Sequence, residues 1–511
     1  MLVKAFGGAV NGIDARIITV ETDVVTGVNF FIVGLPDSAV KESQQRIESA
    51  LRSNGHKLPG KKITINMAPA DIRKEGTAYD LPLAIGILAA SEQIKHENVS
   101  QYLIMGELSL DGGVHRIKGA LSMAIEARKH GFKGFILPKE NAREAAVVND
   151  LEVFGVENIK EVIGFFNETI QLEKTEVNTR EEFYKNIENT AFDFAEVKGQ
   201  ENVKRALEIA AAGGHNIIMI GPPGAGKTML AKRISSILPP LTLQEALETT
   251  KIHSVAGKLG GNSALMTERP YRSPHHTVSD VALVGGGTFP QPGEISLAHN
   301  GVLFLDELPE FKRTVLEVMR QPLEDRTINI SRAKFSVDYP ASFMLIASMN
   351  PCPCGYYNHP EKECVCSPGV VQKYLNRISG PLLDRIDIHI EVVPVPFEEL
   401  SKDEKSETSL NVRNRVIKGR SMQQKRFVDS SIHCNAQMDT KSLQKYCVLD
   451  NAGASLLKQA MEKLGLSARA YDRIIKVSRT IADLEESEDI LSQHVAEAIQ
   501  YRSLDRENWA G

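Results

Sequence analysis

Gly221-Pro-Pro-Gly-Ala-Gly-Lys-Thr228 lies between an apolar run typical of a strand, Asn216–Ile220, and a stretch typical of a helix, Met229–Leu238. Strand, glycine-rich loop and helix in this order form a P-loop, whose backbone N–H groups and helix N-terminus surround phosphates. Lys227 is expected to reach the β- and γ-phosphates, and Thr228 to hold Mg²⁺. We therefore predict ATP binding by all eight loop residues: Gly221, Pro222, Pro223, Gly224, Ala225, Gly226, Lys227 and Thr228.

Two later apolar runs end in polar side chains that suit ATP hydrolysis. Gly301-Val-Leu-Phe-Leu-Asp-Glu307 is a predicted strand with two carboxylates at its end. Asp306 is expected to hold the Mg²⁺ through water, and Glu307 to polarise the attacking water. Asn350 ends the run Phe343–Met349. Its amide either orients that water or forms a turn before the following proline.

Composition limits the class of protein. The chain has 511 residues, of which 42% are hydrophobic and 24% charged, as in ordinary globular proteins. A net charge of −5 argues against unspecific DNA binding, although a ring can keep basic groups inside a pore. No apolar run reaches the roughly 18 residues that a membrane helix needs. Met1–Gly8 lacks the pattern of a signal peptide, so we expect a cytoplasmic protein without a membrane partner.

The chain divides into an α/β unit at 1–166, a polar linker at 167–190, a second α/β unit at 191–397 and a helical unit at 398–511. In the last unit, Ala468–Leu484 places apolar residues along one stripe of a helix. In the first unit, we expect strands at Ile17–Glu21, Phe30–Val33, Lys62–Asn66 and Gly134–Leu137, and helices at Ser38–Asn54, Asp80–Ser91 and Gly119–His130.

Further motifs resemble those of the ComM/YifB family, the magnesium-chelatase-like branch of AAA+ ATPases. They are Met1–Gly7, Val197-Lys-Gly-Gln200, Asn350-Pro-Cys-Pro-Cys-Gly355, Arg377–Asp387 and Gly465–Arg473, and they span nearly the whole chain. The resemblance implies an α/β protein with three parts. These are an N-terminal Lon-protease-like (ribosomal S5-type) α/β domain, a P-loop AAA+ α/β core and a C-terminal helical lid.

The resemblance also implies a ring, typically a hexamer, with ATP bound between neighbouring subunits. Arg385 matches the arginine finger, which stabilises transition-state charge on a neighbour's nucleotide. The alternative for Arg385 is a salt bridge with Asp384 or Asp387. Arg469 matches the sensor 2 arginine of the lid, and Arg473 lies one turn further on. Whether sensor 2 acts on its own or the adjacent nucleotide stays open.

Thr327–Asp338 alternates polar and apolar residues like a hairpin, and it resembles the pore-facing hairpin that precedes sensor 1 in this branch. Arg326, Arg332 and Lys334 would then contact the phosphates of a nucleic-acid strand. The alternative is a solvated hairpin.

Tyr271–Asn300 resembles the helix-2 insertion of the same branch. Gly285-Gly-Gly287 is expected to form a flexible loop tip. We expect a structural role for His275 and His276 rather than a metal site.

The N-terminal unit is predicted to be non-proteolytic. Lon-type proteases carry a serine in a Gly-Pro-Ser-Ala motif, but Ala78 stands at that position in Lys74–Asp80. After Gly106–Lys118, the position of the catalytic lysine falls on Leu121, and Lys118 comes three residues early. Because a nucleophile needs its activating base within hydrogen-bond reach, we expect this unit to lack protease activity. We expect it to bind DNA or a partner instead.

Four of the six cysteines, Cys352, Cys354, Cys364 and Cys366, form two Cys-x-Cys pairs. Two close pairs can supply four thiolates to a structural zinc ion, although this spacing is tighter than usual. His359 is an alternative ligand. The other interpretation is four reduced thiols in a turn.

The family resemblance, rather than any base-reading motif, implies an ATP-hydrolysing ring motor on DNA, similar to the branch-migration helicases that act in recombination during natural transformation. The alternative is a chelatase-like ATPase that remodels a protein partner. Ala78 argues against an ATP-dependent protease. The intact set of Lys227, Asp306, Glu307 and Asn350 argues against a scaffold that binds nucleotide without hydrolysing it.

Overall fold

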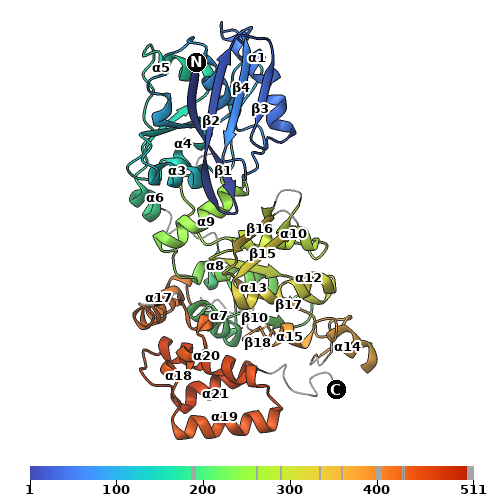
Figure 1. Cartoon of the computed structure of the whole chain (residues 1–511). Coiled ribbons are helices and arrows are strands. Elements are labelled where there is room, and N and C mark those ends of the chain that lie inside the picture. Colours follow the sequence, from blue (N-terminus) through green and yellow to red (C-terminus); the bar gives the residue numbers. More distant parts are fainter. Residues whose placement is uncertain are drawn as a thin grey trace.

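The computed structural model describes residues 1–185, 192–260, 263–287, 290–332, 335–357, 359, 361–396, 398, 406–428, 430 and 432–502. Three parts are stacked along one long axis, with the N-terminal unit at the top, the P-loop unit in the middle and the helical unit at the bottom (Figure 1). The mixed α/β architecture is as predicted. Among the helices of the described residues, none combines the length and apolarity that a membrane crossing requires.

The described part of the N-terminal unit contains a seven-stranded sheet in the order β3-β4-β2-β1-β5-β8-β9. Its strands are β1 (Leu2–Asn11), β2 (Asp14–Val25), β3 (Phe30–Val33), β4 (Lys62–Ala68), β5 (Tyr102–Ile104), β8 (Gly134–Pro138) and β9 (Glu152–Val156). A short pair, β6 (Glu107–Leu108) and β7 (Val114–His115), lies outside this sheet. The helices are α1 (Ser38–Ser53), α2 (Asp80–Ala90), α3 (Ala120–Lys129), α4 (Lys139–Ala145) and α5 (Ile159–Phe166).

The predicted linker at 167–190 differs from the structure. Leu172 is buried in the N-terminal core, and the Thr175 N–H donates to the Val153 carbonyl of β9 at 2.8 Å. Val177 and Phe183, the latter in α6 (Thr179–Lys185), pack against the same core. The average composition of this segment is polar, so it does not reveal the few apolar residues that pack into the core. Residues 186–190 lie outside the described residues.

Five strands of the described P-loop unit form one parallel sheet in the order β11-β14-β17-β10-β18. They are β11 (Tyr271–Arg272), β14 (Val302–Leu305), β17 (Met344–Met349), β10 (Ile217–Ile220) and β18 (Ile388–Glu391). The surrounding helices are α7 (Glu201–Gly213), α8 (Lys227–Ile237), α9 (Leu243–Val255), α10 (Asp280–Val284), α11 (Glu294–Leu297), α12 (Arg313–Val318), α13 (Arg320–Asp325), α14 (Pro368–Leu375) and α15 (Gly380–Leu383). Because the strands are parallel, all their C-terminal ends meet at one edge.

Between α13 and β17, β15 (Thr327–Arg332) and β16 (Phe335–Pro340) pair antiparallel, which confirms the predicted hairpin. The expected glycine loop tip is different. Gly285 and Gly286 form β12, which pairs with β13 (Gln291–Pro292). Gly285 has φ +106°, and a Cβ there would lie 2.4 Å from the Gln291 carbonyl oxygen. Close backbone approach, rather than flexibility, therefore requires this glycine.

The helical unit consists of α17 (Ser409–Arg426), α18 (Thr440–Tyr446), α19 (Asn451–Leu464), α20 (Ala468–Leu484) and α21 (Ser492–Gln500). The predicted stripe of α20 is buried at Ile474, Ile475, Val477 and Ile481. These residues share one apolar core with α7 and β10. The lid therefore packs on the P-loop unit as a continuation of its core.

The N-terminal unit joins the P-loop unit through α3 and α9 (Figure 1). The buried Glu144 carboxylate accepts the Ser254 hydroxyl of α9 and the Leu121 N–H of α3. At the rim, Lys251 pairs with Asp14 at 2.9 Å. Leu241 and Ala246 extend the N-terminal core into the P-loop unit. Buried apolar and hydrogen-bonded contacts thus hold the two units together.

Candidate active site

Lys227 of the P-loop and Asn350, which follows β17, lie in contact at the C-terminal edge of the sheet. Lys227 Nζ donates to the carbonyls of Gly221 at 2.6 Å and Pro222 at 2.9 Å, and to Asn350 Oδ1 at 3.1 Å. Burial lowers the pKa of the Lys227 ammonium, and the negative charges of Asp306 and Glu307 partly offset this effect. A partly desolvated cation at the start of a helix is well suited to bind phosphate.

The loop itself bends as phosphate binding requires. Gly224 and Gly226 have φ values of +81° and +88°, which L side chains rarely adopt. Gly226 immediately precedes α8, which begins at Lys227. The positive end of this helix therefore points into the loop.

The Mg²⁺ residues predicted from sequence also come together. Thr228 Oγ1 donates to Asp306 Oδ2 at 2.8 Å. The other carboxylate oxygen, Oδ1, accepts the Ser348 hydroxyl and the Glu307 N–H. A hydroxyl and a fixed carboxylate are hard oxygen donors, which fit Mg²⁺ bound with waters and substrate phosphates. Ser348 was not predicted from the sequence. The feature that could have indicated it is a single hydroxyl near the end of the otherwise apolar strand β17.

The backbone conformation of Glu307 is unusual. Its φ of 54° and ψ of 50° place it in the left-handed region, which is uncommon for a residue with a side chain. Strain of this kind clusters at active sites, where the surrounding fold maintains it. The side chain is 56% exposed at the end of β14, beside Asp306. It can therefore reach solvent water next to the phosphate loop.

Arg385 is buried, but its partners differ from the alternatives predicted for it. Its guanidinium pairs with Glu324 Oε1 at 2.7 Å and donates to the Pro381 carbonyl at 2.5 Å. The flanking aspartates contact the lid instead. Asp384 lies 3.8 Å from Arg469, and Asp387 lies 3.1 Å from Arg473. The residue beside Arg385 in sequence is thus not its ionic partner: Arg385 pairs with Glu324, and Asp384 lies near Arg469.

These arginines lie at the opposite end of the sheet from the P-loop. Asn216, just before β10, donates to the Arg385 carbonyl at 3.1 Å, whereas the P-loop begins at Gly221 after β10. At about 3.3 Å per residue, these ends are about 16 Å apart. Arg469 contacts Asp384 on the Arg385 side. Within one subunit, therefore, neither Arg385 nor Arg469 lies near Lys227.

Comparisons with known proteins identify the family of the chain. Models described as magnesium chelatase subunit ChlI, subunit ChlI of Mg-chelatase and the ChlI C-terminal part match residues 193–400, 20–141 and 406–502. Competence protein ComM of Haemophilus influenzae is 44% identical over 508 residues, covering 99% of this chain and 98% of the relative. YifB of Salmonella typhimurium is 44% identical over 497 residues, covering 97% and 96%.

The chain belongs to the magnesium-chelatase-like ComM/YifB family. It is a ComM-like AAA+ ATPase, as the sequence motifs predicted. Lon protease 2 of Bacillus subtilis is also 33% identical over 157 residues, covering 28% of this chain and 27% of that protein. In this ComM/YifB chain, Leu121 is a fully buried residue of α3, so an apolar side chain fills the place expected for a protease lysine.

The four clustered cysteines of this ComM/YifB chain converge. Their sulfurs all lie within 4.8 Å of one another, and those of Cys352, Cys354 and Cys364 are 3.3–3.7 Å apart. Four thiolates at about 2.3 Å from one zinc ion would be about 3.8 Å apart, so this donor set fits zinc. His359 Nδ1 instead accepts backbone N–H groups at 3.0 and 3.1 Å.

The cysteine loop also touches the phosphate loop. Gly355 has φ +85°, and a Cβ there would lie 2.4 Å from Pro223 Cδ. Cys352 follows Asn350 by two residues, so one segment links Asn350, the cysteines and the P-loop. A metal in the cluster would therefore stiffen a wall of the ATP site.

Of the three predicted nucleic-acid residues, the structure describes the side chain of Arg326. Arg326 has φ +56° and begins the hairpin at its base, where its Nη1 lies 3.5 Å from Ser342 Oγ. It lines a small cavity with Arg269 and Arg420. The six residues of β15 separate it from the hairpin turn by about 20 Å. The Arg332 side chain and Lys334 lie outside the described residues.

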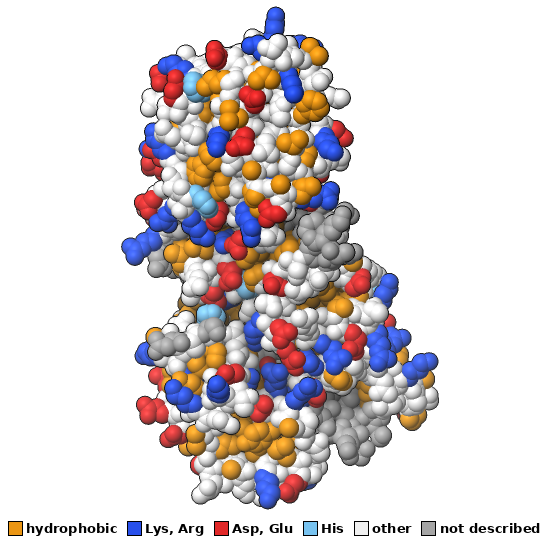
Figure 2. Space-filling view, viewed as in Figure 1, with side chains coloured by type: hydrophobic (Ala, Val, Ile, Leu, Met, Phe, Trp, Pro, Cys, Tyr) orange, Lys and Arg blue, Asp and Glu red, His pale blue; other side chains and the backbone are white. Residues whose placement is uncertain are grey.

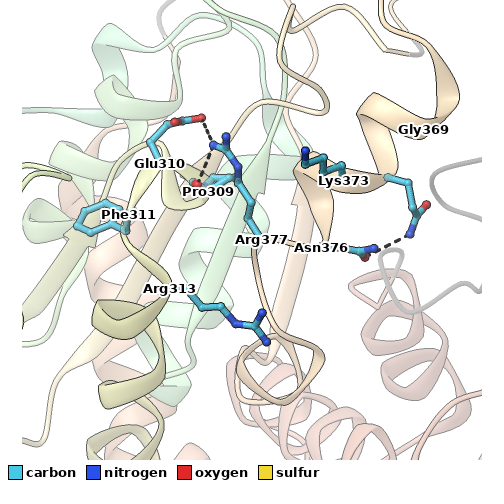
Figure 3. A pocket seen from close by; sticks show the side chains of 9 residues that line it. Pro309, Glu310, Phe311, Arg313, Gly369, Lys373, Asn376 and Arg377 are labelled. Carbon is cyan, nitrogen blue, oxygen red and sulfur yellow. Dashed lines mark hydrogen bonds and ion pairs between the residues drawn. The ribbon is translucent and has the colours of Figure 1, made fainter.

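A groove of about 840 Å³ lies near the ATP site, and its lining includes Pro309, three residues after Asp306 in the chain. Arg313 projects into it from the start of α12, and Lys373 and Arg377 from α14 and its end (Figure 3). Arg377 pairs with Glu310 at 2.9 Å. On the face in Figure 2, Lys and Arg side chains lie over all three parts and are mixed with Asp and Glu. The three basic side chains of the groove are therefore a local feature of a chain with net charge −5.

Proposed function

We propose that this chain is an ATP-driven ring motor, and that each ATP site is shared by two subunits. One observation carries the proposal: Lys227 and Asn350 lie at one end of the sheet, and Arg385 and Arg469 at the other. A neighbour that presents its arginine end to the P-loop end completes the site. Repeating that head-to-tail contact produces a ring, for which the family suggests six subunits.

In this arrangement each side chain has a distinct task. Lys227 binds the β- and γ-phosphates, while Thr228 and Asp306 hold Mg²⁺, which neutralises phosphate charge. Glu307 accepts a proton from the attacking water, and Asn350 orients that water. Arg385 of the neighbouring subunit stabilises the charge that develops on the γ-phosphate, with Arg469 as a second cation.

We propose DNA, single-stranded or branched, as the polymer on which the ring moves. Three features support this: the hairpin β15–β16, the groove with Arg313, Lys373 and Arg377, and a close relative named a competence protein. Phosphate contacts from such groups are independent of base sequence. The reaction we favour is branch migration during recombination of incoming DNA in natural transformation.

A chelatase-like ATPase that remodels a protein partner is the second candidate, because the three matching family models are all named for a magnesium chelatase subunit. For the N-terminal unit we propose DNA or partner binding without proteolysis, since Ala78 and Leu121 stand where a dyad would be. We further propose that Cys352, Cys354, Cys364 and Cys366 hold one structural zinc ion.

One experiment separates these candidates. ATP turnover of the full chain is measured alone, with a single-stranded oligonucleotide, with duplex DNA and with a four-way junction. We expect the single strand or the junction to bind and to raise turnover. Lys227→Ala should abolish turnover, whereas Lys232→Ala, an exposed lysine on the same helix, should not. If no DNA binds or changes turnover, the DNA motor is rejected in favour of a protein substrate.

A further inference from the structure

A small cavity lies between the base of the β15–β16 hairpin and the helical lid, at the end of the sheet opposite to the P-loop. Its lining includes Gly214, just before β10, and Gly301, which directly precedes β14, whereas the P-loop follows β10. The cavity volume is about 60 Å³. Because one water needs about 10–15 Å³, there is room for about four to six heavy atoms. That is the size of one phosphate or sulfate ion and too small for a nucleoside.

Positive charge exceeds negative charge around this cavity. Arg269, Arg326 and Arg420 line it, and among its described lining residues Glu245 is the one carboxylate. Glu245 pairs with Arg269 at 3.2 Å. The Arg269 guanidinium also donates to two backbone carbonyls at 2.7 and 2.6 Å, so protein groups occupy it. Arg326 and Arg420 therefore leave two positive charges that no carboxylate of the lining offsets.

These two guanidinium groups have hydrogen-bond donors to spare, since each carries five N–H groups. In the described part of the chain, the Arg326 guanidinium has one long contact, to Ser342 Oγ at 3.5 Å. Arg420 donates to the carbonyls of His433 at 3.3 Å and Ala211 at 2.9 Å. Its Nε is buried and meets no acceptor among the described residues. A buried donor without an acceptor costs free energy, which a bound anion would recover.

A neutral donor joins the two arginines. Ser342 Oγ accepts from Arg326 and, at 3.3 Å, from Gln437 Nε2. Gln437 belongs to η4 (Asn435–Gln437) of the lid. A hydroxyl oxygen that accepts twice still has its own hydrogen to donate. Donors from the hairpin base, from the residue before Phe343 and from the lid therefore line one space.

The backbone of Arg326 is also unusual for an arginine. It ends α13 with φ 56° and ψ 22°, in the left-handed region that glycine adopts more easily. Backbone strain of this kind is common where a side chain serves a ligand. A glycine here would keep the turn and lose the guanidinium, which makes this position a clean one for a test.

The positive field extends beyond the cavity lining. Burial and the nearby Arg473 lower the pKa of the Lys476 ammonium to about 8, Asp387 partly offsets this effect, and Arg326 adds to it. Arg326 is thus close enough to a second cation for the two charges to repel each other. An anion beside Arg326 would reduce this repulsion.

We infer that this cavity binds one tetrahedral oxyanion of the phosphate or sulfate type, held by Arg326 and Arg420, and that the bound ion joins the hairpin base to the lid. The site is separate from the proposed ATP site, and anion binding requires neither ATP turnover nor DNA. Such an ion can be free inorganic phosphate or the phosphoryl group of a small nucleotide. The cavity volume favours the free ion.

The test uses the full chain carrying Lys227→Ala, so that the P-loop lysine does not contribute to phosphate binding. Inorganic phosphate, sulfate and chloride are compared at equal ionic strength by calorimetry and by thermal unfolding. Phosphate and sulfate should bind once per chain and raise Tm, and chloride should not. Adding Arg326→Gly should weaken phosphate binding about 10-fold or more, because a charged hydrogen-bond donor is lost.

Two further variants make this result specific. Arg52→Ala removes the same charge from a side chain that is 72% exposed on α1, and it should keep the phosphate affinity of the parent. Arg420→Lys keeps the charge but lacks the Nε donor, so it should weaken phosphate binding. Equal phosphate affinity with and without Arg326→Gly would overturn the site.

Two competition experiments identify the source of the oxyanion. AMP should not displace phosphate, because its nucleoside does not fit the cavity. AMP binding that is as tight as phosphate binding and is lost in Arg326→Gly would overturn the free ion as the occupant and assign the site to a nucleotide phosphoryl group. A single-stranded oligonucleotide that displaces phosphate and requires Arg326 would overturn the small-anion site in favour of nucleic acid.

Discussion

The Asp387 carboxylate lies 3.1 Å from the Arg473 guanidinium, and this ion pair connects the helical lid to the start of the edge strand β18. Asp387 is fully buried, and its second oxygen accepts the Asn216 N–H at 3.1 Å and contacts His215 Nδ1 at 3.3 Å. One carboxylate therefore connects the lid, β18 and the residue before β10. Any motion of the lid must act on the segment that carries Arg385.

Removing this carboxylate should destabilise the chain. Asp387→Ala leaves Arg473 and the Asn216 N–H without their partner, and breaking a buried pair costs about 3–5 kcal/mol. The free energy of unfolding, measured by denaturant titration, should fall by this amount. Asp384→Ala is the control, because its contact with Arg469 is exposed and 3.8 Å long, and it should change stability by under about 0.5 kcal/mol.

The same carboxyl predicts a pH dependence of stability. Burial alone raises the pKa of Asp387, but the nearby Arg473 and His215 outweigh it, so the pKa lies below its usual range. An unfolded aspartate has a pKa of about 3.9, so below about pH 5 the unfolded chain binds more protons and stability is lost. The stability advantage of wild type over Asp387→Asn should shrink between pH 6 and pH 3. A constant difference would contradict this account.

Ser348 should affect Mg²⁺ binding by orienting the Asp306 carboxylate. Its hydroxyl donates to Asp306 Oδ1 and keeps Oδ2 directed at Thr228. Losing an outer contact of a metal-binding carboxylate typically costs 10- to 100-fold, so Ser348→Ala should raise the Mg²⁺ concentration for half-maximal turnover about 10-fold. Ser109→Ala, in the N-terminal unit, serves as the control. An unchanged Mg²⁺ dependence would show that Ser348 does not orient Asp306.

The cysteine cluster should hold one zinc ion per chain. Elemental analysis of the purified protein should find it, and Cys364→Ser should remove it, because three thiolates rarely complete a structural site. Since Gly355 contacts Pro223, loss of zinc should also weaken ATP binding. Cys447→Ser, which changes a buried cysteine outside the cluster, should keep the metal. A wild-type chain without zinc would refute the site.

The sequence predicted those parts of the site that depend on local order. The P-loop, the acids at Asp306 and Glu307, and Asn350 each follow a short apolar strand, and parallel strands bring such ends together. The alternation of polar and apolar residues likewise predicted the hairpin β15–β16.

Contacts between distant segments were not predictable in this way. Glu324 of α13 pairs with Arg385, which follows α15, and His276 lies near Glu307 because β11 pairs with β14. The anchoring of Leu172 in the N-terminal core was hidden by the polar residues around it. Each depends on tertiary packing, which no sequence window contains.

The central claim, an ATP site shared between two subunits, is tested most directly by mixing two inactive variants. Lys227→Ala loses the phosphate contact and Arg385→Ala loses the finger, each lowering turnover by about 10³-fold or more. In mixed rings, confirmed by native mass spectrometry, some interfaces pair an intact Lys227 with an intact Arg385. We predict that turnover reappears on mixing. Mixed rings that stay inactive, or Arg385→Ala alone with full turnover, would contradict the account.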